Sequence, residues 1–422
     1  MEYKGKICML KFKQHLAEAA AKNTHMVHLE DLVLDGGVKG ARQAINALRS
    51  LRDMLAGNSK TQVDVTVKWD GAPAVFAGKD PSDGQFFVAK KGIFNANPKV
   101  YKNHEDIDAD TSGDLNAKLK VAFDTLKDLG ITNVIQGDIM FTKGDLKNET
   151  IDGQKMVVFH PNTIAYAIPV GSDLEKQISA ADLGVVWHTT YEGATFETMK
   201  ASFGKEIVPK LKSSKKVWMQ DATLPDVSGT ATMTAAETAE CTKYLSNAGK
   251  IFNKIAGSTL KEIESNKELN LIINTYNNTK VRANERITNT TKHVDGLIDY
   301  VNDRYMKQAD KLKSDAGKHR KFAQRDEILK FFSGSNKKSL KNVFDLQNSI
   351  VDAKLIIINK LNSLNNINTF VKTASGFKVT NHEGFVAIDR MEGGAVKLVD
   401  RLEFSTNNFS KDIIKGWDSP SR

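Results

Sequence analysis

The feature that most constrains this fold is a change of residue pattern along the chain. Residues 231–371 contain no proline, and apolar residues recur at intervals of three and four, as in "IVDAKLIIINKLNSL", which predicts almost continuous helix. Residues 63–192 instead contain short apolar runs of strand type, interrupted by one amphipathic helix, "LNAKLKVAFDTLKDLG". Strand character returns in "GFKVTNHEGFVAID". The pattern predicts a β-rich domain that is interrupted by a long helical insertion and completed by strands after it.

This pattern divides the chain into four parts and gives an α+β fold class built on antiparallel sheet. Residues 1–60 form an N-terminal helical segment, because "GARQAINALRSLRDML" has apolar residues at helical spacing. Residues 61–230 form the first part of the β-rich core, residues 231–372 the helical insertion, and residues 373–422 the last strands and the tail.

Charge is concentrated in the insertion. The 422 residues carry a net charge of +9, yet residues 243–372 alone hold 24 Lys and Arg against 13 Asp and Glu. Such a surface favours a polyanionic partner, because each neutralised phosphate releases counterions. A solvated, charge-rich helical face is the open alternative. If the partner is nucleic acid, we expect the contacts to include Lys318, Arg320, Lys321 and Arg325.

The rest of the composition fits a protein of the cytoplasm. Cys8 and Cys241 are far apart and form no disulfide framework or thiolate metal motif. The N-terminus lacks the apolar core of a signal peptide, and no apolar run reaches membrane-spanning length. We therefore expect a protein of the cytoplasm without membrane contact, and we also expect a monomer.

A lysine stands where the stretch "VTVKWDGAPAVF" changes from strand to turn. Val65 and Val67 alternate with polar residues, which predicts a half-buried strand that ends at Lys68. Asp70, Gly71 and Pro73 are turn formers. Three roles are open for a lysine at this position: a surface residue, a contact to phosphate, or a nucleophile. Which role applies depends on the other residues of the site.

Other charged and aromatic residues stand at comparable strand ends or turns. Together they suit a nucleoside triphosphate: lysines for the phosphates, two carboxylates for a divalent metal, and an aromatic ring to stack on a base. The members of this set are Lys68, Lys90, Lys91, Asp138, Phe159, Glu383 and Lys397.

The order of these residues resembles the covalent nucleotidyltransferase superfamily, which contains the ATP-dependent DNA and RNA ligases and the mRNA capping enzymes. "KWDG" matches its Lys-x-Asp-Gly element, and five further elements follow in the family's order: "KKG", "IQGDIMF", "MVVF", "EGFV" and "AVKLV". The resemblance covers residues 63–192 and 376–404. It implies an antiparallel-sheet nucleotidyltransferase core, an ATP-grasp-like ligase fold.

The resemblance also implies a role for each residue. Lys68 would attack the α-phosphate of ATP to form lysyl–AMP, and Lys397 would assist catalysis and contact the nucleotide. Mg²⁺ or Mn²⁺ would lie near Asp138 and Glu383, and Glu383 would also contact the nucleotide. The remaining nucleotide contacts would be made by Asp70, which binds the ribose or holds the lysine loop, by the base-stacking Phe159, and by Gly71, Lys90 and Lys91.

Two departures from the family pattern bear on these roles. Asp138 stands where the family usually has Glu, and Val399 stands where it has a second lysine. Arg401 or a basic residue of the insertion is therefore expected to share the phosphate contacts of Lys397.

The resemblance narrows the function to polynucleotide joining. The residues after Lys397 are too few for the oligonucleotide-binding barrel that capping enzymes and DNA ligases carry. We therefore expect a divergent, phage-type polynucleotide ligase that joins 5′-phosphate and 3′-hydroxyl ends of RNA and/or DNA, with a preference for RNA or RNA–DNA hybrids. If a phage encodes it, we expect it in the host cytoplasm. Two alternatives stay open: a non-catalytic nucleic-acid-binding or virion-associated protein with a ligase-like fold, and an enzyme that adenylylates proteins or small molecules.

Overall fold

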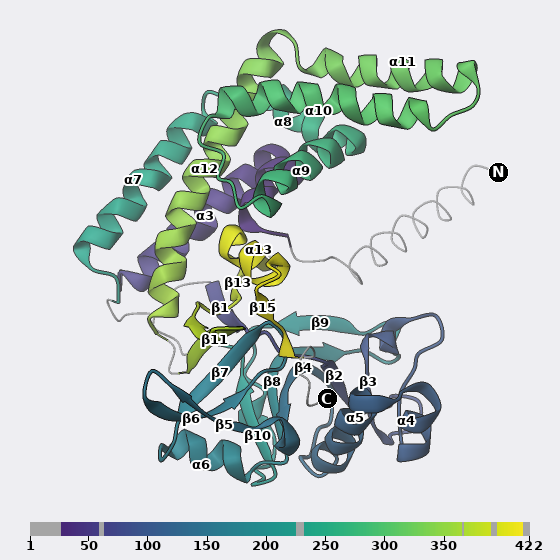
Figure 1. Cartoon of the computed structure of the whole chain (residues 1–422), viewed down its shortest axis with the longest axis vertical. Helices are drawn as coiled ribbons and strands as arrows, with labels where there is room; N and C mark the ends of the chain where they lie inside the picture. Colours follow the sequence, from purple (N-terminus) through teal and green to yellow (C-terminus); the bar gives the residue numbers. More distant parts are fainter. Residues whose placement is uncertain (1–26, 59–62, 225–231, 365–366, 390–394, 417–422) are drawn as a thin grey trace, which may run out of the picture.

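The protein consists of one half that contains the sheets, with a few helices beside them, and one half that is mostly helical (Figure 1). The structure is a computed structural model that describes residues 27–58, 63–224, 232–364, 367–389 and 395–416. Figure 1 shows the sheets in the lower half, which we call the strand body, and most helices in the upper half. The sheets are antiparallel except for one parallel pair of strands, so the α+β class expected from the sequence is confirmed. Cys8 lies outside the described residues.

The first six-stranded sheet has the order β10-β8-β4-β2-β3, with β9 beside β8. Helix α5 packs on it through Leu119, Ala122 and Leu126, which share a buried cluster with Val75 and Trp187. The elements of this part are β2 (Ala74–Lys79), β3 (Phe86–Ala89), η2 (Lys91–Phe94), α4 (His104–Asp110), α5 (Gly113–Leu126), β4 (Val134–Thr142), β8 (Leu183–Glu192), β9 (Lys200–Phe203), η4 (Val208–Lys210) and β10 (Val217–Asp221).

The second six-stranded sheet has the order β12-β11-β7-β6-β5, with β15 beside β11. It includes the end of the expected helical insertion, because residues 368–373 form strand β11 after the last helix has ended at Asn362, and β11 pairs with β7. Its elements are η3 (Lys143–Asp145), β5 (Lys147–Ile151), β6 (Gln154–Phe159), β7 (Ile164–Pro169), α6 (Asp173–Ala180), β11 (Asn368–Thr373), β12 (Gly376–Val379) and β15 (Ile413–Ile414).

A three-stranded sheet, β1-β13-β14, carries the residues that the sequence singled out. Its strands are β1 (Val63–Lys68), β13 (Gly384–Asp389) and β14 (Ala395–Leu398). In the register of this sheet, Lys68 pairs with Gly384 and Val386 pairs with Lys397. The strands after the insertion therefore complete the strand body, as the sequence predicted.

The helices before β1 and those of the insertion form one unit, which we call the helical body. The sequence pattern predicts a separate segment for residues 1–60, but α3 lies beside α7, α8 and α12 and shares their core. Residues 1–26 lie outside the described part. The helical body contains η1 (Leu29–Asp31), α2 (Leu32–Asp35), α3 (Gly37–Leu55), α7 (Ala235–Phe252), α8 (Gly257–Ser265), α9 (Lys267–Arg282), α10 (Thr290–Asp310), α11 (Asp315–Phe331) and α12 (Gly334–Asn362).

The insertion returns to the place where it began. Its first helix, α7, starts at a capping box formed by Thr234 and Glu237. The last helix, α12, runs antiparallel beside α7: Lys360 near its end pairs with Glu237 at 3.1 Å, and Asn247 donates to Ser349 at 3.1 Å. The two ends of the insertion are therefore close together.

One hydrophobic cluster continues from the helical body into the strand body, from Leu48 and Ile350 to Val65 and Phe385. Burial of apolar surface, at about 25 cal/mol per Å², therefore stabilises the contact between the two bodies. Within the described ranges, every helix is too short or too polar to cross a bilayer.

Candidate active site

Lys68 and Glu383 form the centre of the candidate site. Lys68 is the last residue of β1, and Glu383 directly precedes β13, so the pairing of these strands places their side chains together. The Lys68 ammonium forms an ion pair with Glu383 Oε2, and both side chains are largely buried. Burial raises the pKa of Glu383, and the Lys68 ammonium opposes that rise.

Asp70 holds the loop that follows Lys68. Its carboxylate accepts hydrogen bonds from Asn162 Nδ2 at 2.6 Å and from the backbone N–H groups of Thr163 and Ile164 at 2.8 Å each. Its own backbone N–H donates to Tyr166 Oη at 2.8 Å. Of the two roles expected for Asp70, this geometry fits the structural one, because the carboxylate fixes the lysine loop against β7.

Gly71 lets the same loop approach β4. A Cβ atom at this position would lie 2.6 Å from Asp138 Cβ and 2.8 Å from Met140 Sδ, which is closer than real Cβ atoms come to their neighbours. Glycine therefore brings the lysine loop onto the strand that carries Asp138.

Asp138 is the second carboxylate near Lys68. Burial raises the pKa of Asp138 to about 7, the positive charges of Lys68 and Lys91 oppose the rise, and the negative charge of Asp70 adds to it. His188, on the neighbouring strand β8, places Nε2 at 3.7 Å from Asp138 Oδ2. The sequence alone gives His188 no predicted role; its only signal is a histidine that ends the apolar run "VVW".

Lys397 lies within electrostatic reach of this group. Burial lowers the pKa of Lys397, the positive charge of Lys68 adds to that effect, and the carboxylate of Glu383 opposes it. Its backbone N–H donates to the Val27 carbonyl at 3.0 Å, so the chain just before the helical body borders β14. The structure thus gathers Lys68, Asp138, Glu383 and Lys397.

The other expected nucleotide contacts are placed differently. Lys90 pairs with Asp110 at 2.9 Å, whereas Lys91 is exposed in η2 and near enough to Asp138 to influence its pKa. Phe159 is fully buried and stacks on Tyr166 with 5.3 Å between ring centroids. The expectation that Phe159 stacks on adenine therefore needs correction, because its ring belongs to the core.

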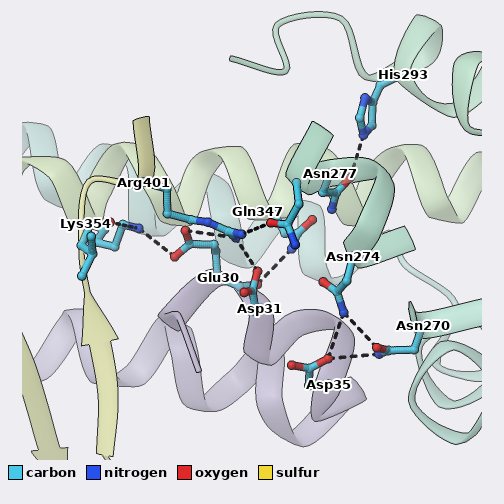
Figure 2. A network of polar contacts seen from close by, with 12 residues as sticks. Glu30, Asp31, Asp35, Asn270, Asn274, Asn277, His293, Gln347, Lys354 and Arg401 are labelled. Atoms are coloured by element: carbon cyan, nitrogen blue, oxygen red, sulfur yellow. Dashed lines mark hydrogen bonds and ion pairs between the residues drawn. The ribbon is translucent and has the colours of Figure 1, made fainter. Parts of the chain in front are cut away.

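Arg401 does not join Lys397 as a phosphate contact. Figure 2 shows its guanidinium among residues of the helical body: it donates to Asp31 Oδ1 at 2.8 Å and to Asn278 Oδ1 at 2.5 Å. Lys354 of α12 donates to Glu30 Oε2 at 2.7 Å and to the Val399 carbonyl at 2.8 Å. We call Glu30, Asp31, Lys354 and Arg401 the junction network. It connects the helical body to the end of β14, and the expected phosphate role of Arg401 is corrected to a structural one.

The four basic residues proposed to contact nucleic acid lie on α11. Arg320 is exposed, and the other three are partly exposed. Arg325 lies over the Phe322 ring at 5.1 Å and pairs with Asp326, and Lys321 donates to Gln324 at 2.9 Å. Figure 1 shows α11 at the end of the helical body far from β1 and β13, so these residues do not belong to the group around Lys68.

The described residues contain no cluster of three or more His, Cys, Asp or Glu side chains that could hold a metal ion. The positive charge of Lys68 acts on both Asp138 and Glu383, and these two carboxylates could hold an ion only together with other ligands. That arrangement is common for Mg²⁺, which is often bound by one or two carboxylates plus substrate phosphates and water.

Comparison with known proteins yields a family assignment. No curated protein and no solved structure matches the chain. A family described as "Family of unknown function (DUF6267)" matches residues 23–413, which include the helical body, the strand body and every residue gathered around Lys68. Because the match spans nearly the whole sequence, the chain belongs to the DUF6267 family.

Proposed function

We propose that this protein is an ATP-dependent polynucleotide ligase that joins 5′-phosphate and 3′-hydroxyl ends of RNA or RNA–DNA hybrids. The observation that carries the proposal is the ion pair of Lys68 with Glu383, with Asp138 and Lys397 in electrostatic reach. A strand-end lysine between a second lysine and two carboxylates suits attack on a phosphate. The order of the sequence motifs supports the same chemistry.

In the first step Lys68 Nζ attacks the α-phosphorus of ATP. A P–N bond forms, the bond to the bridging oxygen breaks, and pyrophosphate leaves. An ordinary lysine, with a pKa of about 10.4, is almost wholly protonated at neutral pH, so Lys68 must lose a proton. Glu383 is the acceptor in contact with it, and Lys397 supplies a second positive charge for the phosphates.

A divalent cation would be held by Asp138 and Glu383 together with phosphate oxygens. When bound, it would neutralise charge on the triphosphate and help pyrophosphate to leave. In the later steps the AMP group passes from Lys68 to a 5′-phosphate end. A 3′-hydroxyl then attacks that end and releases AMP.

The first test is self-adenylylation. The protein is incubated with ATP labelled at the α-phosphate and with Mg²⁺ or Mn²⁺, after pyrophosphate has removed any AMP already bound, and intact mass is measured. We expect one AMP adduct on the wild type and none on Lys68→Ala. Lys79→Ala is the matched control, because Lys79 ends β2 as Lys68 ends β1 but is exposed and lies at the far end of β2 from Asp138.

Absence of an adduct on the wild type with both metals would refute the ligase proposal. The alternative, a nucleic-acid-binding protein with a ligase-like fold, would then be tested by its affinity for strands with and without a 5′-phosphate.

The role of α11 needs its own test, because Figure 1 shows α11 far from β1, the strand that ends at Lys68. A variant with four substitutions in α11 should bind 5′-phosphorylated strands more weakly: Lys318→Gln, Arg320→Gln, Lys321→Gln and Arg325→Gln. The slope of log K against log salt should decrease by about 0.7 to 0.9 for each phosphate that is no longer neutralised. Lysyl–AMP formation should not change. The control replaces four exposed lysines of the strand body and alters net charge equally: Lys210, Lys212, Lys215 and Lys216. Equally weakened binding in both variants would contradict a specific role for α11.

A further inference from the structure

His188 is the extra residue of a β-bulge beside Asp138. In the pairing of β4 with β8, Gln136 lies opposite Thr189 but Gly137 lies opposite Trp187, so His188 has no partner in the ladder. A Cβ on Gly137 would lie 2.4 Å from the Val186 carbonyl oxygen, so this irregular pairing requires glycine there. Bulges redirect a side chain and are frequent next to functional sites.

The imidazole of His188 is held so that one nitrogen remains available. Nδ1 lies 2.7 Å from Thr189 Oγ1, and the residues that the structure describes give Nε2 no hydrogen-bond partner. When Nδ1–H donates to the hydroxyl, the lone pair of Nε2 faces the Asp138 carboxylate at 3.7 Å. Histidines that bind metals are oriented in this way, by a hydrogen bond from the nitrogen that does not bind the ion.

We propose that Asp138 and His188 together bind a divalent transition-metal ion, with Mn²⁺ preferred over Mg²⁺. Two ligand atoms at about 2.1 Å from one ion are about 3.0 to 3.4 Å apart, so the 3.7 Å separation requires a shift of only a few tenths of an ångström. An imidazole nitrogen increases affinity for transition metals more than for Mg²⁺, which prefers oxygen ligands.

Asp138 and His188 leave coordination positions for Glu383, which the proposed function places beside the same ion, and for phosphate oxygens and water. The inference deepens the proposed function and rests on it for the catalytic purpose of the ion: the metal that assists lysyl–AMP formation would be Mn²⁺, selected by His188. Binding of the ion itself can be measured without ATP or nucleic acid.

The test is Mn²⁺ binding to the full chain without nucleotide, followed by electron paramagnetic resonance. We expect one saturable site whose spin-echo signal is modulated by an imidazole ¹⁴N nucleus. His188→Ala should abolish that modulation and weaken Mn²⁺ binding about tenfold or more, while affinity for Mg²⁺ changes less than about threefold. Asp138→Asn should also weaken Mn²⁺ binding, and circular dichroism checks that both variants fold.

The matched control is His104→Ala. His104 also pairs with a carboxylate, Asp124 at 3.0 Å, but both side chains are well exposed. This variant should retain the wild-type Mn²⁺ affinity and the nitrogen modulation. Bound Mn²⁺ without nitrogen modulation, unchanged modulation in His188→Ala, or no saturable site would each overturn the proposal.

Failure of this inference can be distinguished from failure of the proposed function. A nitrogen-coupled Mn²⁺ site in a protein that never forms lysyl–AMP would support the metal site and refute the ligase. Lysyl–AMP that forms equally well with Mg²⁺ in wild type and His188→Ala, without a nitrogen-coupled site, would support the ligase and refute the metal site.

Discussion

Lys354→Met is the sharpest test of how the two bodies are joined. The Lys354 side chain is 1% exposed and that of Glu30 is 5% exposed, so their ion pair is almost completely removed from water. Methionine retains most of the length and apolar character of the lysine but leaves the Glu30 carboxylate without its partner. Arg401 Nη1 remains 3.9 Å from Glu30 Oε1 and compensates only in part.

The expected magnitude follows from this burial. Removal of one partner of a buried ion pair costs about 3 to 5 kcal/mol, and the remaining Arg401 places this case near 3 kcal/mol. That loss corresponds to about a hundredfold increase in local opening. Hydrogen exchange measured by mass spectrometry on peptides covering residues 27–31 and 395–401 reports the opening directly.

Two further variants make this test decisive. Lys360→Met, on the same helix, breaks the more exposed pair with Glu237 and should cost less than about 1 kcal/mol. The double variant Lys354→Met with Glu30→Gln should recover much of the loss, because no unpaired charge stays buried. If hydrogen-exchange rates in Lys354→Met stay within about threefold of the wild-type rates, the expected cost of about 3 kcal/mol is refuted. If the double variant is less stable than Lys354→Met, the explanation by an unpaired buried charge is refuted.

The effect of pH provides an independent check. Burial opposes ionisation of Glu30, but Lys354 and Arg401 hold the pKa of this carboxyl below its usual range. The stability that this pair contributes is therefore present at neutral pH and is lost as pH falls through that lowered pKa. Without Lys354, burial raises the pKa of Glu30, so the deficit of the variant should become smaller as pH falls and Glu30 takes up a proton.

Three other predictions concern the lysine loop and the helical body. Asp70→Asn should lower the free energy of unfolding by about 2 to 3 kcal/mol and reduce lysyl–AMP formation, because the Asp70 carboxylate accepts three hydrogen bonds that fix the loop. An unchanged melting temperature would contradict this. Gly71→Ala should displace the loop from Asp138, visible in a crystal structure of the variant, and slow lysyl–AMP formation, whereas an undisplaced loop would contradict the close approach. Burial lowers the pKa of His293 to about 4, so the unfolded chain binds its proton more readily, and the contribution of this one group to stability should fall by about 1.4 kcal/mol per unit as pH drops from 6.5 to 4. Urea denaturation at several pH values should give a flatter profile for His293→Gln and an unchanged one for the exposed control His319→Gln.

The sequence predicts where the helices and strands lie better than it predicts which of them pack or pair with one another. Strands β1, β4 and β7 lie within residues 63–192, where short apolar runs predicted strands, because such runs are local signals. That α3 joins the insertion could not be predicted, since the contact of α3 with α12 joins distant segments and leaves no periodic pattern. Packing across that distance depends on the complete tertiary structure.

The candidate site shows the same limit. Lys68 and Glu383 could be paired in advance only through the order of motifs, because their proximity depends on pairing of β1 with β13. The apolar run around Phe159 predicted its strand, but whether its ring stacks on a ligand or fills the core depends on what covers it. His188 was missed because a bulge is a property of two paired strands and cannot be recognised in one of them.

The two ends of the insertion lie close together, and this has a consequence for synthesis of the chain. Strand β1 leaves the ribosome long before β13, the strand that pairs with it, and until then its edge is open to aggregation. Because α7 and α12 lie side by side, a folded insertion returns the chain to its starting point and replaces a long flexible loop by a short one. The helical body would thus act as an internal folding aid: once it forms, β13 emerges close to its waiting partner, and Lys68 meets Glu383 only when nearly the whole protein has been made.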